Sequence, residues 1–347
     1  MRVTVHCAAA SADAPAVGGL ALKCTPSERK VWVERGSGAG RKIAFSSTYD
    51  GVVDGDAPQA LYDAAIAPAV AAATADKVGC VLCVGTGAGK RAAFLGTAAE
   101  VAIAKLLQAA DEKGLELTIA AVLVMWERLT DLIDGSAIEP GATATGGGDG
   151  AAQSPAALFG ASTRVLASAS AASGALRDVE AAAAAAEAAA VGVGGGGHVA
   201  LQLTLGEGRL LLVDAADLAF AEDSSAVLAS TLCHHSHAML SKCLAKPSTR
   251  PALADTALLP RLLGGAFFDG GASARLVLHV PPTASQVMTT DCCRLPPIAA
   301  DGLAGKSFLR ILARRLPSSP SLGASPPLAG DRRHAALGAG GGQGGQV

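Results

Sequence analysis

The sequence predicts an α/β protein in which helices flank a central, mostly parallel β-sheet. Short apolar or alternating segments have the length and residue types of strands, and alanine- or leucine-rich helical segments separate several of them. A glycine-rich turn and a lysine directly follow one of these strands, as in phosphate-binding loops. The expected strands cover Arg2–Cys7, Val78–Val84, Leu117–Val124, His198–Leu205, Arg209–Asp214 and Arg275–Val280.

Composition restricts the classes of partner. Among the 347 residues, 50% are hydrophobic but only 3% are aromatic, so the core must be built from Leu, Val and Ala. A net charge of −2 gives no global attraction to nucleic acid. The opening MRVTVHCAAA lacks the apolar run of a secretory signal, and charges or glycines interrupt the most apolar windows. We therefore expect a cytoplasmic protein that binds neither nucleic acid nor a membrane.

The cysteines and histidines predict no metal site. The 8 cysteines lie scattered in a chain without secretory features, which is typical of reduced core thiols. Cys80 and Cys83 form a CxxC motif, but residues three apart on a strand point to opposite faces. The run CHHSH at 233–237 has two candidate ligands on one helix face, Cys233 and His237, and no evident further ligand. A solvent-exposed histidine cluster is the favoured interpretation.

The sequence divides into one large domain and a tail. We expect a domain over residues 1–300, with a flexible insert at 135–155 that is rich in Gly, Ala and Thr. A short amphipathic helix with a basic face is expected within 301–316. Residues 317–347 are rich in Pro, Gly and Ser and are expected to be disordered.

The stretch VLCVGTGAGKRAAF at 81–94 is the main candidate for a functional site. Phosphate-binding loops use glycine backbone N–H groups and a lysine to hold phosphates, and a Ser or Thr hydroxyl to hold Mg²⁺. Here Arg91 takes the place of that hydroxyl, and Val84 stands where the first glycine is required. Both a nucleotide cradle and a lysine that merely caps a loop remain open. The candidate nucleotide-binding residues of this stretch are Gly85, Thr86, Gly87, Ala88, Gly89, Lys90 and Arg91.

Several segments, taken in chain order, resemble a kinesin motor domain over roughly residues 1–300. YDGVVDGDAPQALYDAAIAPAV at 49–70 is similar to the FDxVF region that precedes the kinesin P-loop GQTGSGKT. GRLLLVDAADLAF at 208–220 is similar to GKLxLVDLAGSER, and His198 stands at the end of SSRSH. Weaker matches are AVLVMWERLTDLI at 121–133, SHAMLSKCL at 236–244, ADTALLPRLLGG at 254–265 and ARLVLHVPP at 274–282.

The resemblance implies a P-loop NTPase fold of the kinesin-motor kind, an ATP pocket and a surface that faces tubulin. It adds His198 and Asp214 to the nucleotide site, Asp214 as a residue that holds Mg²⁺ through water. Asp214 could instead cap the turn after its strand. The basic residues Lys242, Lys246, Arg250 and Arg261 fall where kinesins contact tubulin, although an ordinary solvated face is the alternative.

Departures from the family pattern remove most of the ATPase chemistry. Arg91 replaces the threonine that binds Mg²⁺, and Gly194–Gly197 replace the SSRS of switch I. In switch II, Asp217 replaces the glycine that senses γ-phosphate, and Ala219 replaces the glutamate that pairs with the switch I arginine. We therefore expect weak ATP binding, a lost Mg²⁺ site and little or no hydrolysis, and assign no catalytic residue.

Three functions remain open at this stage. The favoured one is a kinesin-like module that attaches to microtubules, or to another cytoskeletal or ciliary assembly, without turning over ATP. The alternatives are an active ATP-dependent microtubule motor and an unrelated P-loop kinase. The kinase hypothesis accounts only for residues 78–95, whereas Arg91, the glycine run and Asp217 argue against an active motor.

Overall fold

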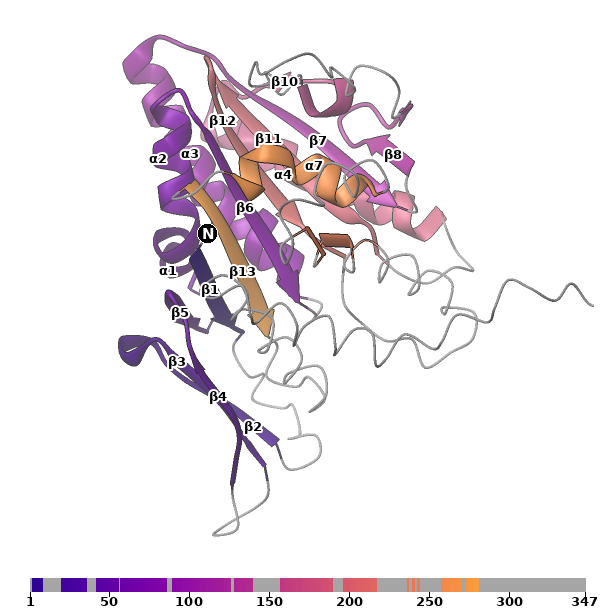
Figure 1. The fold of residues 1–347 in the computed structure, drawn as a ribbon. Coiled ribbons are helices and arrows are strands. Elements are labelled where there is room, and N and C mark those ends of the chain that lie inside the picture. The colour runs from indigo at the N-terminus through magenta and orange to yellow at the C-terminus, as the bar shows by residue number, and fades with distance from the viewer. Residues whose placement is uncertain are drawn as a thin grey trace, which may run out of the picture.

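The central sheet combines strands that are far apart in the chain. The computed structural model describes residues 2–8, 20–35, 42–55, 57–85, 89–125, 128–139, 157–189, 196–216, 236, 239–240, 242–243, 257–269 and 273–280. Within these residues, one sheet of 10 strands forms (Figure 1). Its order is β5 (Gly51–Asp54), β1 (Arg2–Cys7), β13 (Ala274–Val280), β6 (Val78–Gly85), β12 (Gly208–Asp214), β11 (His198–Leu205), β7 (Leu117–Met125), β8 (Arg128–Asp131) and β9 (Ala137–Ile138), with β10 (Arg164–Val165) paired to β7.

The half of the sheet from β5 to β12 is parallel, whereas β11 is antiparallel to both β12 and β7. The parallel strands are buried on both faces, which explains their nearly continuous apolar sequences. The predicted α/β class, with helices around a central and largely parallel sheet, is confirmed. All the expected strands form, and antiparallel pairs at one side make the sheet mixed.

Helices cover both faces of the sheet. One apolar cluster joins a face of the sheet to the first helical layer, and a second cluster joins the other face to α7 (Leu258–Phe268) and the short η7 (Ala157–Gly160), as Figure 1 shows for α7. The first layer contains α1 (Pro58–Leu61), the π-helical η4 (Tyr62–Ile66), α2 (Ala67–Thr74), the π-helical η5 (Ala92–Ala98), α3 (Ala99–Lys113) and α4 (Ala169–Ala189).

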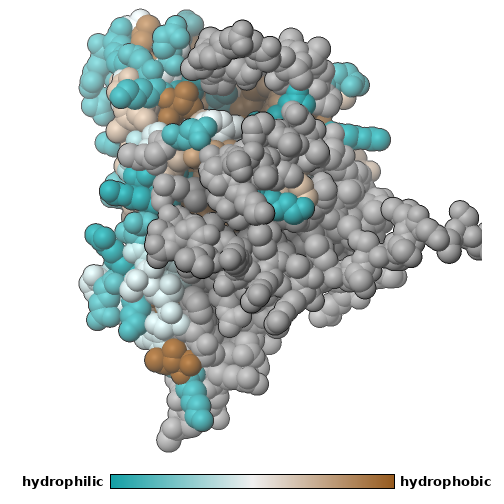
Figure 2. Space-filling model, viewed as in Figure 1, coloured by the Kyte–Doolittle hydropathy of each residue, from teal (hydrophilic) through white to brown (hydrophobic). Residues whose placement is uncertain are grey.

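A separate sheet of 3 antiparallel strands follows β1 in the chain. It consists of β2 (Leu20–Thr25), β3 (Lys30–Arg35) and β4 (Lys42–Thr48), with the 3₁₀ turn η2 (Pro26–Glu28) between its first two strands. Val31 anchors it to the second apolar cluster. On the face seen in Figure 2, hydrophilic side chains gather along the edge of the molecule formed by α2 and α3.

The expected domain organisation stays a prediction, because most of the segments that define it lie outside the described residues. Of the insert expected at 135–155, residues 135–139 are described and include β9. The rest of that insert, the helix expected within 301–316 and the tail at 317–347 lie outside the described residues. Among the described helices, the continuous stretch Ala92–Lys113 is long and apolar enough to cross a membrane, by length and composition only. Its apolar side chains pack into the first core cluster.

Glycines allow α2 to lie directly on the sheet. A Cβ added to Gly79 of β6 would come within 2.2 Å of the Ala69 carbonyl oxygen, and one added to Gly208 of β12 would come within 1.8 Å of the Ala73 oxygen. No side chain can occupy either space without moving the helix backbone. The alanine-rich composition is therefore used here for close helix-to-sheet contact, where aromatic side chains would not fit.

We predict that Gly208→Ala lowers the free energy of unfolding by about 1–3 kcal/mol, the usual cost of overpacking a core. The matched control is Gly174→Ala in α4, where an added Cβ meets nothing within 4 Å. That control should raise stability by up to about 1 kcal/mol, because alanine favours a helix more than glycine does. Urea denaturation measures both changes, and equal effects would contradict the close approach of α2.

Candidate functional site

The glycine turn lies between a central strand and a helix, as a phosphate-binding loop requires. Strand β6 ends at Gly85, and the helical region begins at Lys90 and continues into η5. Gly85 has a φ of +137°, and a Cβ there would lie 2.0 Å from the His279 carbonyl oxygen. Only glycine fits this position. Thr86, Gly87 and Ala88 lie outside the described residues, and Gly89 is exposed.

The strand order brings the other predicted site residues to this turn. Strand β12 pairs with β6 so that Asp214 lies beside Cys83, and β12 also pairs with β11 so that Asp214 lies beside Val199. The end of β6, the end of β12 and the start of β11 therefore meet. Lys90, Arg91 and Asp214 are in direct contact there.

A buried carboxylate joins the two cations. Lys90 Nζ lies 3.0 Å from Asp214 Oδ1, and both side chains are only 2% exposed. Lys90 also donates a hydrogen bond to the Ala215 carbonyl oxygen. Arg91 Nε donates to the second carboxylate oxygen, Asp214 Oδ2, at 3.2 Å. Oδ1 accepts no well-formed hydrogen bond, so Lys90 holds it as an ion pair. The lysine ammonium is thus directed at the protein itself.

Glu187, near the end of α4, completes the set of charges. Its Oε2 accepts a hydrogen bond from Arg91 Nη1 at 3.1 Å and its Oε1 accepts one from Nη2 at 2.8 Å, a two-point contact. Oε1 also accepts the Gly197 N–H at 2.8 Å, and Arg91 Nη2 donates to the Gly197 carbonyl at 3.2 Å. Burial alone would lower the pKa of Arg91, but Glu187 and Asp214 outweigh burial and raise this pKa above its ordinary value. The guanidinium remains charged.

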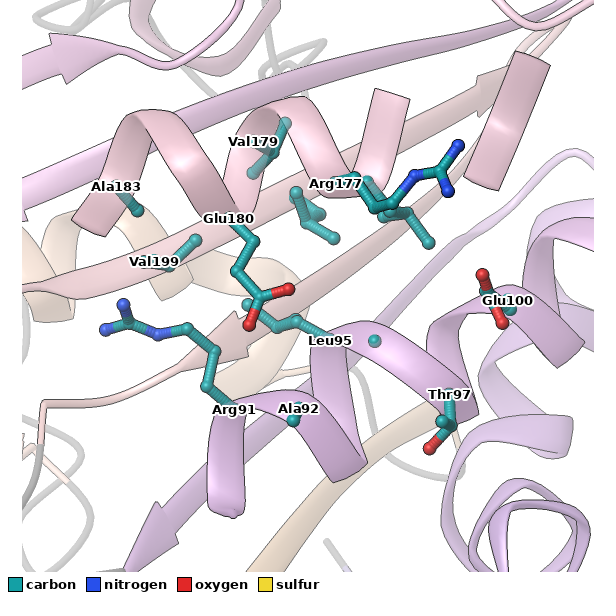
Figure 3. A pocket seen from close by; sticks show the side chains of 13 residues that line it. Arg91, Ala92, Leu95, Thr97, Glu100, Arg177, Val179, Glu180, Ala183 and Val199 are labelled. Atoms are coloured by element: carbon teal, nitrogen blue, oxygen red, sulfur yellow. The ribbon is translucent and has the colours of Figure 1, made fainter. Parts of the chain in front are cut away.

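Sequence reasoning did not identify Glu187. It lies 96 residues from Arg91 in the chain, within an alanine-rich helix, and no local motif marks it. Arg91 extends from the start of η5 on the side of the molecule where α4 lies (Figure 3), and Glu187 is near the end of that helix. The only sequence signal was the isolated acidic residue in an alanine run close to the predicted glycine segment.

His198 has a structural role in this arrangement. The ring is buried, and its Nδ1 accepts the Ala216 N–H at 2.8 Å, so it fixes the chain just after β12. As a neutral imidazole with Nδ1 accepting, it carries its proton on Nε2. His198 therefore positions the backbone beside Asp214. Gly194, Gly195, Asp217 and Ala219, on which the switch alignments depended, lie outside the described residues.

The basic residues expected to face tubulin are only partly described. Lys242 is exposed. Arg261 lies in α7, half-buried, with its guanidinium carbon 5.8 Å from the centre of the Phe159 ring. Lys246 and Arg250 lie outside the described residues, as do the cysteine and histidines of the run at 233–237.

The prediction that Cys80 and Cys83 of the CxxC motif point to opposite faces of the sheet is confirmed. Cys80 packs in the cluster on one face of the sheet and Cys83 in the cluster on the other. Both are buried and neither forms a disulfide, and burial raises the pKa of the Cys80 thiol well above its ordinary value. Among the described residues, no group of three or more His, Cys, Asp or Glu side chains is arranged to hold a metal ion.

A pair of buried histidines lies next to the glycine turn and was not predicted. His6 of β1 and His279 of β13 are register partners, and their Nδ1 atoms are 3.1 Å apart. His6 Nε2 lies 3.2 Å from the Gly55 carbonyl oxygen, which can only accept. A neutral His6 therefore carries its proton on Nε2, and His279 donates from Nδ1. Burial, then the nearby His6 and Lys90, lower the pKa of His279 to about 3.

Searches for related proteins give no family. No protein-family model matches the sequence, and no curated protein is similar enough to count as a relative.

We predict that Asp214→Asn lowers the free energy of unfolding by about 3–5 kcal/mol, because it leaves the buried Lys90 without a counter-charge. The matched control is Asp178→Asn, which removes an ion pair with Arg164. The Asp178 side chain is 64% exposed and that of Arg164 is 40% exposed. That loss should be below about 1 kcal/mol. Denaturant unfolding distinguishes them, and a mild effect of Asp214→Asn would mean that water reaches Lys90.

We predict that stability falls as the pH is lowered from about 6.5, because the unfolded chain then protonates His279 and the folded chain does not. The folded pKa of about 3 keeps this imbalance in place down to about pH 3. Between pH 7.5 and 5, the free energy of unfolding of His279→Asn should fall by up to about 2 kcal/mol less than that of the parent. Parallel curves of unfolding free energy against pH for the two proteins would contradict this prediction.

Proposed function

We propose that this protein is a kinesin-like P-loop module whose nucleotide site is closed by its own ion pairs, and that it attaches to microtubules without hydrolysing ATP. One observation carries the proposal. Arg91, at the position of the Mg²⁺-binding hydroxyl, is held by Asp214 and Glu187, while Lys90 is held by Asp214. The groups that would receive a phosphate are bound to each other.

The convergence of separate segments supports the P-loop part of the proposal. The resemblance assigned Lys90, the glycine run before His198, and Asp214 to three elements that close around one phosphate. Arg91 is 123 residues from Asp214 and 106 from Gly197 and nonetheless contacts both, and Lys90 contacts Asp214 as well. An unrelated P-loop kinase would also place an aspartate such as Asp214 beside the loop, because P-loop enzymes commonly hold Mg²⁺ with one. It gives no reason for the later matches, in chain order, at 236–244, 254–265 and 274–282.

The residues present do not fit Mg²⁺. Phosphoryl transfer by P-loop enzymes depends on Mg²⁺ and on a positioned water more than on covalent chemistry by the protein. Here both oxygens of Asp214 already face cations, and a guanidinium lies where the metal ligand belongs. Placing a divalent cation beside Arg91 would bring like charges together at close range. This favours the module that does not hydrolyse ATP over an active motor.

The microtubule, or a related cytoskeletal or ciliary assembly, is the proposed partner on the strength of the resemblance. The exposed Lys242 is the described residue that best suits a contact with acidic tubulin, together with Lys246 and Arg250 outside the described residues. Arg261 contributes its charge from beside Phe159. The corresponding location is the cytoplasmic cytoskeleton.

We predict that the full chain cosediments with microtubules at low salt, loses this binding as salt is raised, and shows no microtubule-stimulated phosphate release. Exposed charge contacts weaken as the Debye length falls from about 30 Å at 0.01 M to about 8 Å at 0.15 M. Lys242→Ala combined with Lys246→Ala and Arg250→Ala should weaken cosedimentation. Salt-independent binding would contradict the charged interface, and stimulated turnover would contradict the closed site.

Arg91→Thr tests whether the ion pairs of Arg91 are what prevents ATP binding, as opposed to a pocket that binds ATP weakly for other reasons. It restores the missing hydroxyl and should give measurable Mg²⁺-dependent ATP affinity by titration calorimetry, but no turnover, since residues that act as a unit are not rescued singly. Arg128→Thr, at an exposed position in β8, is the matched control and should leave ATP binding as weak as in the parent. Tight Mg²⁺-dependent binding by the parent would overturn the proposal.

A further inference from the structure

Two cysteines meet where the three-stranded sheet joins the central sheet. The smaller sheet projects from the side of the central sheet on which β5 and β1 lie (Figure 1). Cys7 is the last residue of β1 and is buried. Cys24 lies in β2, is partly buried, and packs against the second apolar cluster, to which Cys7 belongs. Their side chains form a hydrogen bond, and neither cysteine is in a disulfide.

A carboxylate lies beside the same two sulfurs. Strands β1 and β5 are parallel, and their register places Asp54, the last residue of β5, directly beside Cys7. Strand β2 also contacts β5, and the side chains of Asp54 and Cys24 form a hydrogen bond. Asp54 is exposed. Strands from two different sheets therefore bring two thiols and one carboxylate together at a place that solvent reaches.

These surroundings keep Cys24 in its thiol form. Burial is the largest effect and raises the pKa of Cys24, the hydrogen bond with Cys7 opposes burial, and the charge and hydrogen bond of Asp54 add to it. A hydrogen bond that favours the thiolate is one that the Cys24 sulfur accepts, so Cys7 donates to Cys24 and Cys24 donates to Asp54. Because the thiolate is the nucleophile, Asp54 slows the reactions of Cys24.

We propose that Cys7 and Cys24 are a reversible disulfide site that a small oxidised disulfide such as glutathione disulfide closes, fastening the three-stranded sheet to the central sheet. The more accessible Cys24 thiolate attacks one sulfur of glutathione disulfide, which forms a mixed disulfide and releases one glutathione thiolate. The Cys7 thiolate then attacks the Cys24 sulfur and expels the second. Two protein thiols are oxidised, one glutathione disulfide is reduced, and the two protons pass to the released thiolates.

The proposal does not rest on the kinesin-like assignment, because it uses neither nucleotide nor microtubule binding. It is tested on the full chain, first reduced and then incubated with glutathione disulfide at mildly alkaline pH. Trypsin cuts after Lys23, so the two cysteines fall in the separate peptides 3–23 and 24–29. Mass spectrometry should find these peptides joined, with the loss of two hydrogen atoms, in most of the protein. Cys80 and Cys83 are the internal control and should stay unmodified, because both are buried.

Thermal unfolding measures whether the bond fastens the two sheets. The oxidised parent should melt at least about 5 °C above the reduced parent, because a bond between positions 7 and 24 restricts the unfolded chain. A dithiol reductant should reverse both the peptide joining and the shift. Cys24→Ser should melt at the same temperature with and without the oxidant.

Asp54→Asn tests the role assigned to the carboxylate. Without the negative charge, a larger fraction of Cys24 is thiolate, so the bond should form about twofold faster or more. The matched control is Asp111→Asn, at an exposed residue of α3, which should leave the rate of the parent unchanged. Equal rates in Asp54→Asn and the parent would remove Asp54 from the proposal.

Three results would overturn the disulfide site itself. A Cys24 that keeps glutathione as a stable mixed disulfide would show that Cys7 cannot reach its sulfur. A Cys24 that joins another cysteine in place of Cys7 would assign the wrong partner. Joined peptides with an unchanged melting temperature would show that the bond does not fasten one sheet to the other.

Discussion

The buried Asp214 carboxylate is the interaction on which the whole site depends. It lies at the end of β12, next to the glycine turn, and binds Lys90 through one oxygen and Arg91 through the other. Glu187 supplies the second negative charge, so two cations face two anions and the local charge sums to zero. A phosphate-binding site works by presenting uncompensated positive charge. Among the described residues of this site, no such charge remains uncompensated.

The energetic consequence follows from the burial of the pair. Two unit charges 4 Å apart interact by about 4 kcal/mol at an effective dielectric constant of about 20, against about 1 kcal/mol in bulk water. A phosphate that approaches Lys90 must separate it from Asp214 and then remain beside that carboxylate. Both effects oppose nucleotide entry. The chain just after β12 is fixed at the same place. Lys90 donates a hydrogen bond to the Ala215 carbonyl oxygen, and His198 accepts one from the Ala216 N–H.

Local sequence patterns predicted the strands and the glycine turn with Lys90 and Arg91, because alternation and turn chemistry depend on near neighbours. The resemblance to a kinesin motor domain, and no local pattern, put Asp214 in the same expected site, 123 residues from Arg91. They could not predict Glu187, whose contact depends on how α4 packs 96 residues away from Arg91. They also missed the His6 and His279 pair, which exists because β1 and β13 are parallel neighbours across 273 residues. Strand order and helix packing are not local properties.

The most direct test of the closed site is the NMR signal of the Arg91 side-chain Nε–H. In the parent protein this proton is donated to Asp214 at an N···O distance of 3.2 Å, and it should exchange slowly with water. The account predicts that saturating Mg²⁺ and ATP leave its chemical shift and its exchange rate unchanged. A shifted or rapidly exchanging Arg91 signal on addition of nucleotide would show that the ion pairs open, and would contradict the central claim.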